Sequence, residues 1–207
     1  QWYHDHGYNF VILSEHNKFI DPKTIKLKGK VRKDFLLVPV EEVTGSKTIH
    51  STAMNVNRLV PWNFDHQHRS KIIQKHVDET IKAGGATILN HPNFGWAVQA
   101  KDMLPVKKLY MFELYNGHPS VRNFGDQRHP STEQLWDDLL TQGMTIFVVG
   151  SDDAHHFADW APKKSNPGRG LVMVHAKELT SQALTDAMTR GDFYSSSGVM
   201  FKKVVRH

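Results

Sequence analysis

Short apolar runs that end in histidine, aspartate, glutamate or asparagine recur along the chain. The clearest covers residues 145–149, which are mostly apolar and β-branched, and Asp152, Asp153, His155 and His156 follow it closely. An apolar run of this length predicts a strand that is buried on both faces. Similar runs predict further strands at residues 8–13, 35–40, 86–89, 109–112 and 170–174.

Helical spacing of apolar residues occurs between several of these runs. Ile72, Ile73 and Val77 fall on one face of residues 70–83, and Gly84 follows at a typical helix end. The same reasoning predicts helices at residues 131–143 and 180–190, a helix end at 1–7, a short extended piece at 48–50, a loop at 51–69 and a tail at 193–199 that returns to the sheet.

The order of these elements predicts the fold class. Strands that alternate with helices or long connections favour parallel pairing with right-handed crossovers. Polar clusters follow five successive strands, and an open sheet would bring together only those near one switch point, whereas a closed barrel gathers all of them at one rim. We therefore predict a single α/β domain over residues 1–207, an irregular (β/α) barrel of mostly parallel strands.

Composition narrows the class of protein. With 207 residues, 39% hydrophobic and 23% charged, the chain has ordinary globular composition. It has no cysteine, which excludes disulfides and thiolate ligands but leaves the compartment open between cytoplasmic and secreted or periplasmic. No apolar run approaches the roughly 20 residues that span a bilayer, so we expect no membrane partner.

The net charge of +5 suits anionic partners. Because we interpret the lysines and arginines as scattered along the chain, we expect a small anionic substrate and do not expect nucleic acid. The oligomeric state is not indicated by the sequence.

The groups expected at the rim are imidazoles and carboxylates, a combination that suits Zn, Mn or Fe better than Mg or Ca. The set is too large for one tetrahedral site, so we predict two or more divalent ions bridged by a carboxylate such as Glu42. The predicted metal ligands are His16, Glu42, His50, His91, Asp153 and His155. Further candidates for the site are Glu15, Glu113, Asn116 and Asp152.

Clustered cations lower the pKa of a bound water and stabilise an anionic transition state. Asp153 and His155 are therefore also predicted to be catalytic, together with His118 on a rim loop and Arg169, which could bind a phosphate or carboxylate. A flexible surface loop is the alternative for Arg169, and His156 is either a ligand or a neighbour of one. The remaining histidines that we predict to be solvated or packing residues are His66, His68, His76, His129, His175 and His207.

The chain carries no Gly-x-Ser-x-Gly nucleophile motif, no Walker loop and no Rossmann glycine fingerprint. Instead it resembles the PHP (polymerase and histidinol phosphatase) domain of metal-dependent hydrolases. The residues that carry this resemblance are Leu13-Ser14-Glu15-His16-Asn17, Glu42-Val43-Thr44, Asn90-His91-Pro92, Glu113 with Asn116, and Gly150-Ser151-Asp152-Asp153-Ala154-His155. The Asp-Asp-Ala-His-His corner, the Pro-Gly-Arg-Gly loop and the closing Gly-Asp-Phe-Tyr-Ser-Ser-Ser-Gly-Val are most similar to the branch named for carbaryl hydrolases.

The resemblance implies a barrel one βα unit short of the common form, with up to three metal ions. It also implies a first His-x-His motif that should lie upstream of Gln1, so the domain is expected to be N-terminally incomplete and to lack its first strand here. His4-Asp5-His6 is interpreted as a solvated helix terminus and not as that motif. Glu15 replaces the usual aspartate of the second motif.

We therefore predict a metal-dependent hydrolase that uses a metal-activated water, with phosphate esters as the first substrate class. Hydrolysis of a carbamate, ester or amide on the same fold is the alternative within enzymes. A non-catalytic metal- or nucleic-acid-binding module is the alternative from another class.

Overall fold

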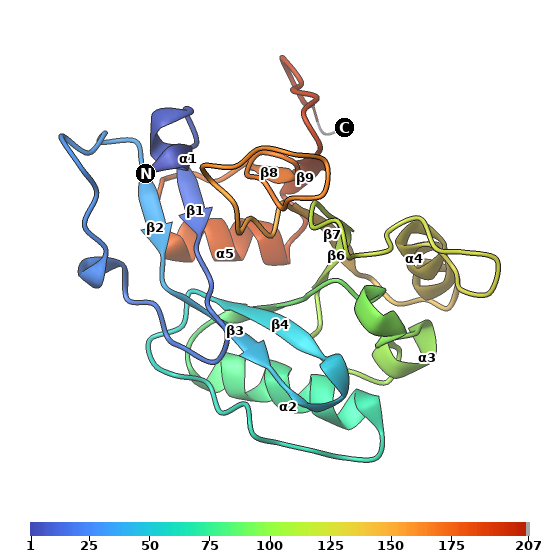
Figure 1. The fold of residues 1–207 in the computed structure, drawn as a ribbon. Helices are drawn as coiled ribbons and strands as arrows, with labels where there is room; N and C mark the ends of the chain where they lie inside the picture. The colour runs from blue at the N-terminus through green and yellow to red at the C-terminus, as the bar shows by residue number, and fades with distance from the viewer. Residues whose placement is uncertain (206–207) are drawn as a thin grey trace.

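The structure is a computed structural model that describes residues 1–205, and its strands form three sheets. A five-stranded sheet in the order β3-β4-β5-β6-β7 lies at the centre, and the pairs β1-β2 and β8-β9 lie beside it (Figure 1). The strands are β1 (Phe10–Ile12), β2 (Leu36–Val38), β3 (Val40–Thr44), β4 (His50–Met54), β5 (Ala86–Leu89), β6 (Met111–Asn116), β7 (Phe147–Ser151), β8 (Leu171–Val174) and β9 (Phe193–Ser196). The α-helices are α1 (Trp2–Asp5), α2 (Arg69–Lys82), α3 (Ala100–Met103), α4 (Thr132–Thr141) and α5 (Ser181–Thr189), and short 3-10 turns cover Pro22–Thr24, Ser46–Thr48 and Phe94–Trp96.

The strand directions are mixed. The pairs β1-β2, β5-β6 and β6-β7 are parallel, whereas β3-β4, β4-β5 and β8-β9 are antiparallel. None of the three sheets closes on itself within residues 1–205. The predicted α/β class with parallel segments is confirmed, but a closed barrel of mostly parallel strands is not. The single-domain boundaries stay a prediction.

The predicted loop at residues 51–69 is wrong at its start, because β4 lies there. This strand pairs with β3 on one edge and β5 on the other. Its Ser51, Thr52 and Ala53 are small or polar, so the sequence lacks the apolar run that identified the other strands, yet all three are buried. Pairing on both edges stabilises a strand whose own side chains give little sign of it.

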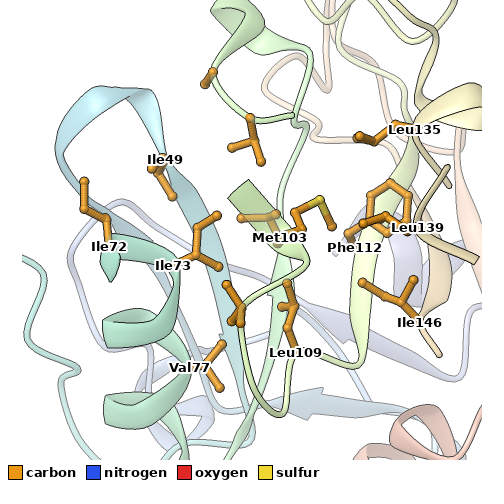
Figure 2. Packing of buried hydrophobic residues seen from close by; sticks show 14 residues of the cluster. Ile49, Ile72, Ile73, Val77, Met103, Leu109, Phe112, Leu135, Leu139 and Ile146 are labelled. Atoms are coloured by element: carbon orange, nitrogen blue, oxygen red, sulfur yellow. The ribbon is translucent and has the colours of Figure 1, made fainter. Parts of the chain in front are cut away.

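One face of the central sheet is covered by α2, α3 and α4. α2 contacts β4 and β5, and α4 contacts β6. Ile72 and Ile73 of α2 belong to one cluster with Ile49, and Figure 2 shows Leu139 of α4 next to Phe112 of β6. This cluster is the larger of the two main apolar cores, and it packs the helices against this face of the sheet.

The opposite face of the sheet faces α5 and the β1-β2 pair. Strand alternation turns Thr52, Ile88, Glu113 and Val149 to this side, while their neighbours along each strand point to the first core. A cavity of about 940 Å³ separates this face from β1. Its apolar floor is lined by Phe10, Ile12, Ile88, Val149, Leu171, Val172, Leu184 and Met188. Polar residues from several strand ends line the same cavity, so the candidate site opens into it.

The N-terminal helix end was correctly predicted, but its His4 is not solvated. His4 is only 8% exposed, and its Nε2 accepts a hydrogen bond from the backbone N–H of Arg32 at 3.0 Å. Its Nδ1 lies 2.7 Å from the Asp5 carboxylate, so both ring nitrogens have partners. In the part of the chain that the structure describes, no helix has the length and apolar character needed to cross a bilayer.

Candidate metal centre

Glu42 lies at the centre of the densest group of predicted ligands. It stands on the cavity face of β3 with 8% of its surface exposed. His50 Nδ1 lies 3.2 Å from Glu42 Oε1, His16 Nδ1 lies 3.6 Å from Oε2, and His91 Nε2 lies 3.8 Å from Oε1. Three imidazoles from three different segments therefore surround one buried carboxylate, and we call these four residues the Glu42 cluster.

The geometry of the Glu42 cluster fits a metal ion. One ligand atom each from His16, Glu42 and His50 lie within 4.8 Å of one another. Among the described residues, His91 Nδ1 is buried without a hydrogen-bond partner, and His50 Nδ1 is buried with the Glu42 carboxylate 3.2 Å away, although buried polar atoms are nearly always paired. A divalent cation is the kind of group that would satisfy such nitrogens, because neutral imidazole is a good ligand for it.

Backbone hydrogen bonds attach the His16 segment to β3. The backbone N–H of Asn17 donates to the Glu42 carbonyl at 2.8 Å, and the backbone N–H of Thr44 donates to Asn17 Oδ1 at 2.7 Å. Asn17 adopts a positive φ of 53°, which is uncommon for a residue with a side chain. The Thr44 hydroxyl also contacts His16 Nδ1, so this strand orients both the carboxylate and the imidazole beside it.

Asn90, at the end of β5, orients Glu42 from the other side. Its Oδ1 accepts from the backbone N–H of Thr52 at 3.0 Å, which leaves its Nδ2 to donate to Glu42 Oε1 at 3.3 Å. His91 follows with a positive φ of 22°. Uncommon backbone conformations of this kind persist where the surroundings fix them, and they concentrate at functional sites.

The electrostatics of the cluster favour an ionised carboxylate. Burial alone would raise the pKa of Glu42, but contacts with His50 and His91 and the charge of His16 outweigh it and hold that pKa far below its ordinary value. Burial also opposes a charge on His91, yet Glu42, Glu113 and Asp153 around it raise the pKa of its imidazole. The cluster thus combines a fixed negative charge with nitrogens that can bind either a proton or a metal ion.

Strand β6 connects this cluster to a second group of predicted residues. Glu113 Oε2 accepts from the backbone N–H of His91 at 2.8 Å and from Asn116 Nδ2 at 2.9 Å. The same Asn116 nitrogen lies 3.2 Å from Asp153 Oδ2. Burial raises the pKa of Glu113, which is only 5% exposed. A bulge in the pairing of β6 with β7, between Glu113 and Tyr115, allows the Asn116 side chain to lie at this junction.

The second group lies at the end of β7 and comprises Asp153, His155 and His118, which we call the Asp153 corner. His155 Nδ1 bonds the Asp153 backbone carbonyl at 2.8 Å and lies 3.7 Å from its Oδ1. The rings of His118 and His155 are 5.5 Å apart. Asp153 also adopts a positive φ, of 47°. Burial lowers the pKa of His118, so this imidazole is neutral near pH 7.

Arg169 and Asp152 are engaged with the protein itself. The Arg169 guanidinium donates to the Gly117 carbonyl at 3.3 Å, the Ala161 carbonyl at 3.0 Å and Asn166 Oδ1 at 3.1 Å. Asp152 Oδ2 accepts from the Tyr3 hydroxyl at 2.8 Å and from the backbone N–H of Gly168 at 2.7 Å. Arg169 therefore ties the β6–α4 loop at Gly117 to its own β7–β8 loop, and its predicted anion-binding role stays a prediction.

The other histidines divide as follows. His76 is fully buried and its Nδ1 lies 3.0 Å from the Ser51 hydroxyl, which confirms a packing role. His156 Nδ1 lies 3.1 Å from the Ser165 hydroxyl. His66, His68, His129 and His175 are at least partly exposed, and His207 lies outside the described residues.

Three residues of the site had no assigned role at the sequence level. Asn90 and Thr44 belong to recognised motifs, and strand alternation could have found them, because each shares the cavity face with Ile88 or Glu42. No local signal points to Tyr3, because its contact with Asp152 joins residues far apart in the chain.

No protein-family model and no curated protein matches the chain. Its fold is similar to a solved structure from Bacteroides vulgatus, a two-domain protein containing a predicted PHP-like metal-dependent phosphoesterase, with a TM-score of 0.56 and 14% sequence identity. The match covers 92% of this chain and 56% of that chain, so this chain spans little more than half the length of the solved protein. At this identity the likeness shows the fold alone.

Proposed function

We propose that this protein is a metal-dependent hydrolase that binds two or three divalent ions. Each ion is Zn, Mn or Fe, and they bind around Glu42 and at the Asp153 corner. The observation that carries the proposal is the Glu42 cluster: a buried carboxylate with imidazole nitrogens of three histidines within 3.8 Å of its oxygens. Its ligand types are those expected for these metals. The six proposed ligands are His16, Glu42, His50, His91, Asp153 and His155.

A purely structural ion-pair network explains the cluster less well. Burying charged groups costs several kcal/mol per ion, to be offset by complete hydrogen bonding. In the Glu42 cluster, His91 Nδ1 has no hydrogen-bond partner among the described residues, and the cluster faces a cavity in place of packed side chains. A bound cation would be compatible with both features.

A divalent ion bound there would lower the pKa of a water molecule and stabilise the negative charge of a hydrolytic transition state. The chain's own residues supply the rest. Asn90 fixes the Glu42 carboxylate, and Asn116 fixes Asp153. The backbone N–H of Ser120 donates to His118 Nδ1 at 3.2 Å, so the neutral imidazole carries its proton on Nε2 and can donate it to a substrate oxygen.

The cavity bears on the substrate class. Its lining includes His16, Glu42, Asp153 and His155 together with the apolar residues named above as its floor. We infer an anionic small molecule with an apolar body, a phosphate ester first. The apolar floor also supports the alternative of a carbamate, ester or amide, because those substrates offer a carbonyl to the rim and little charge elsewhere.

The experiment is metal depletion and reconstitution. The purified chain is stripped with a chelator, and Zn, Mn or Fe(II) is returned while metal content and turnover of a generic phosphodiester and an aryl ester are measured. We expect stoichiometric metal uptake and metal-dependent turnover of the phosphodiester. Turnover of the aryl ester alone would select the alternative, and no stoichiometric uptake of any of the three ions would refute the proposal.

A further inference from the structure

The positive charge of the protein is concentrated in one surface segment, residues 18–33. This segment contains seven lysines or arginines and one acidic residue, a net charge of +6, while the whole chain has a net charge of +5. The other residues together therefore carry a net charge of −1. The interpretation of the cations as scattered does not hold here, and we call this segment the basic loop. Its cations are Lys18, Lys23, Lys26, Lys28, Lys30, Arg32 and Lys33.

The lysines of the basic loop are available to a partner. All six are exposed, whereas Ile25 and Leu27, which alternate with Lys26 and Lys28, are partly buried. None of the six takes part in an ion pair found among residues 1–205; only Arg32 does so, with Asp34 at 3.8 Å. Intramolecular pairing therefore leaves this charge for a ligand.

Hydrogen bonds to the N-terminal helix region give the basic loop a defined conformation. The backbone N–H of Lys28 donates to Gln1 Oε1 at 2.8 Å, and the backbone N–H of Arg32 donates to His4 Nε2 at 3.0 Å. The Arg32 guanidinium also donates to the Tyr8 carbonyl. An anchored surface loses less conformational entropy on binding than a free tail does, which favours its use as an interaction surface.

The basic loop begins beside the candidate metal centre. Lys18 follows His16 by two residues and forms an isolated bridge with Glu15, and Ile20 bridges to Val40 of β3. Figure 1 shows the segment as the irregular blue chain that runs from the end of β1 around to β2, along one side of the molecule. A ligand bound along it would have one end near Glu42.

We propose that the basic loop binds the phosphate backbone of a nucleic-acid strand. Several lysines spaced along an extended surface match a ligand with regularly spaced negative charges. An anionic membrane is the less suitable partner, because membrane-binding segments present large apolar side chains beside their cations. In the basic loop only Val31 is both apolar and exposed.

The test measures the affinity of the protein for a fluorescently labelled single strand of about 20 nucleotides, as DNA and as RNA. Binding is measured by fluorescence anisotropy at salt concentrations of about 25 to 200 mM. The compared variants are Lys26→Gln/Lys28→Gln/Lys30→Gln and a control with equal charge loss, Lys71→Gln/Lys101→Gln/Lys107→Gln, whose lysines are also exposed. We expect the loop variant to bind at least about tenfold more weakly and to lower the log–log salt slope by about 2, at roughly 0.7 per lost phosphate contact. The control should change little.

Three results would overturn the proposal. The first is that the parent shows no salt-dependent binding of the oligonucleotide. The second is that both triple variants bind the oligonucleotide equally weakly, and the third is that the basic loop binds phosphatidylserine vesicles in place of the oligonucleotide. Thermal unfolding of each variant verifies that it is folded. A chelator added to the parent should leave binding unchanged, because no residue of the basic loop is a proposed metal ligand, so this proposal can succeed or fail independently of the hydrolase proposal.

Discussion

The Glu42 cluster and the Asp153 corner use the same kinds of side chain but hold them differently. In the Glu42 cluster, imidazoles from three segments surround one carboxylate, which Asn90 orients. In the Asp153 corner, Asn116 bonds the Asp153 carboxylate, and the ring nitrogen of His155 bonds the Asp153 backbone. The Glu42 cluster therefore holds ligand atoms of His16, Glu42 and His50 within 4.8 Å of one another, whereas the His155 imidazole of the Asp153 corner is bonded to the backbone of that corner.

This difference suggests an order of events. A metal ion entering the Glu42 cluster would meet ligand atoms that already lie within 4.8 Å of one another, so little rearrangement is needed. An ion at the Asp153 corner would first have to compete with hydrogen bonds inside the protein. We therefore expect the tighter site at Glu42 and the weaker one at Asp153.

The largest expected effect follows from Glu42→Gln. A neutral amide keeps nearly the same shape but cannot balance the charge of a cation, so metal content at the cluster should be lost and hydrolysis should fall by roughly 1000-fold. Glu41→Gln is a matched control. Glu41 is the adjacent buried carboxylate on the opposite face of β3, where it accepts from the Val60 backbone N–H at 2.6 Å and burial raises its pKa.

Elemental analysis and turnover of both variants provide the measurement. Glu41→Gln should retain its metal and most of its activity, since the cavity does not include Glu41. If both variants lose metal equally, the loss comes from destabilising β3 and the special role of Glu42 is refuted.

Asp153→Asn should have the next largest effect, a loss of roughly 100-fold in turnover. Asparagine has almost the same shape, so no cavity forms and the unfolding temperature should change little. It is a poor metal ligand, so ions bound at this corner should be lost while the ion at Glu42 remains. Metal titration of the variant distinguishes the two regions directly. Retention of every ion with normal turnover would show that the Asp153 corner takes no part in the chemistry.

The pH dependence of stability gives a third, smaller test, made on metal-free protein. The pKa of His91 is raised above 6.5, so its contribution to stability is complete below pH 6.5 and is lost as the pH rises through the folded-state value. Glu42 has a lowered pKa, so its contribution is present above pH 4.5 and is lost on acidification. The cluster should therefore stabilise the metal-free protein most between these pH values.

Melting temperatures across about pH 6 to 8.5 measure this effect, and His91→Gln is the reference. We expect the parent to lose roughly 2–4 °C relative to the variant as the pH rises, if the cluster contributes about 1 kcal/mol. Added Zn should reverse the trend, because metal replaces the proton on the same imidazole. Identical pH profiles of the metal-free parent and variant would contradict this account.

The sequence predicts the elements well where a strand or helix has its own apolar signal. Residues 86–89 coincide with β5, and residues 70–83 nearly coincide with α2. β4 was missed because Ser51 and Thr52 are polar and their burial depends on partners supplied by β3 and β5. The same antiparallel strand changes the topology, so the error in one strand also led to the prediction of parallel closure.

For the candidate site, the predicted ligands stay a prediction, and the structure places them in two groups that the sequence did not distinguish. The strand-then-ligand pattern applies to His91 and Asp153, which follow β5 and β7, but Glu42 lies inside β3 and His50 begins β4. The division into two regions depends on Glu113 and Asn116, whose positions follow from strand register and a bulge that no short motif encodes. The contacts of Arg169 depend on how the β7–β8 loop folds back on itself and onto Gly117, so its position between two glycines gave no information about them.

The smallest expected effect is that of His118→Ala, which tests whether the Asp153 corner includes a residue that orients substrate. His118 lies beside His155, and its Nδ1 already accepts from the Ser120 backbone N–H. If its role is to donate a hydrogen bond from Nε2 to a substrate oxygen, removal should raise KM or lower kcat by about tenfold, less than the roughly 100-fold or more expected for a group that transfers a proton, and leave metal content unchanged. Because burial lowers the pKa of His118, the parent's activity should not depend on a charged imidazole at this position near pH 7.

His118→Gln keeps a donor of similar reach and should restore part of the activity. Loss of metal in His118→Ala would instead make this histidine a ligand and extend the Asp153 corner by one residue.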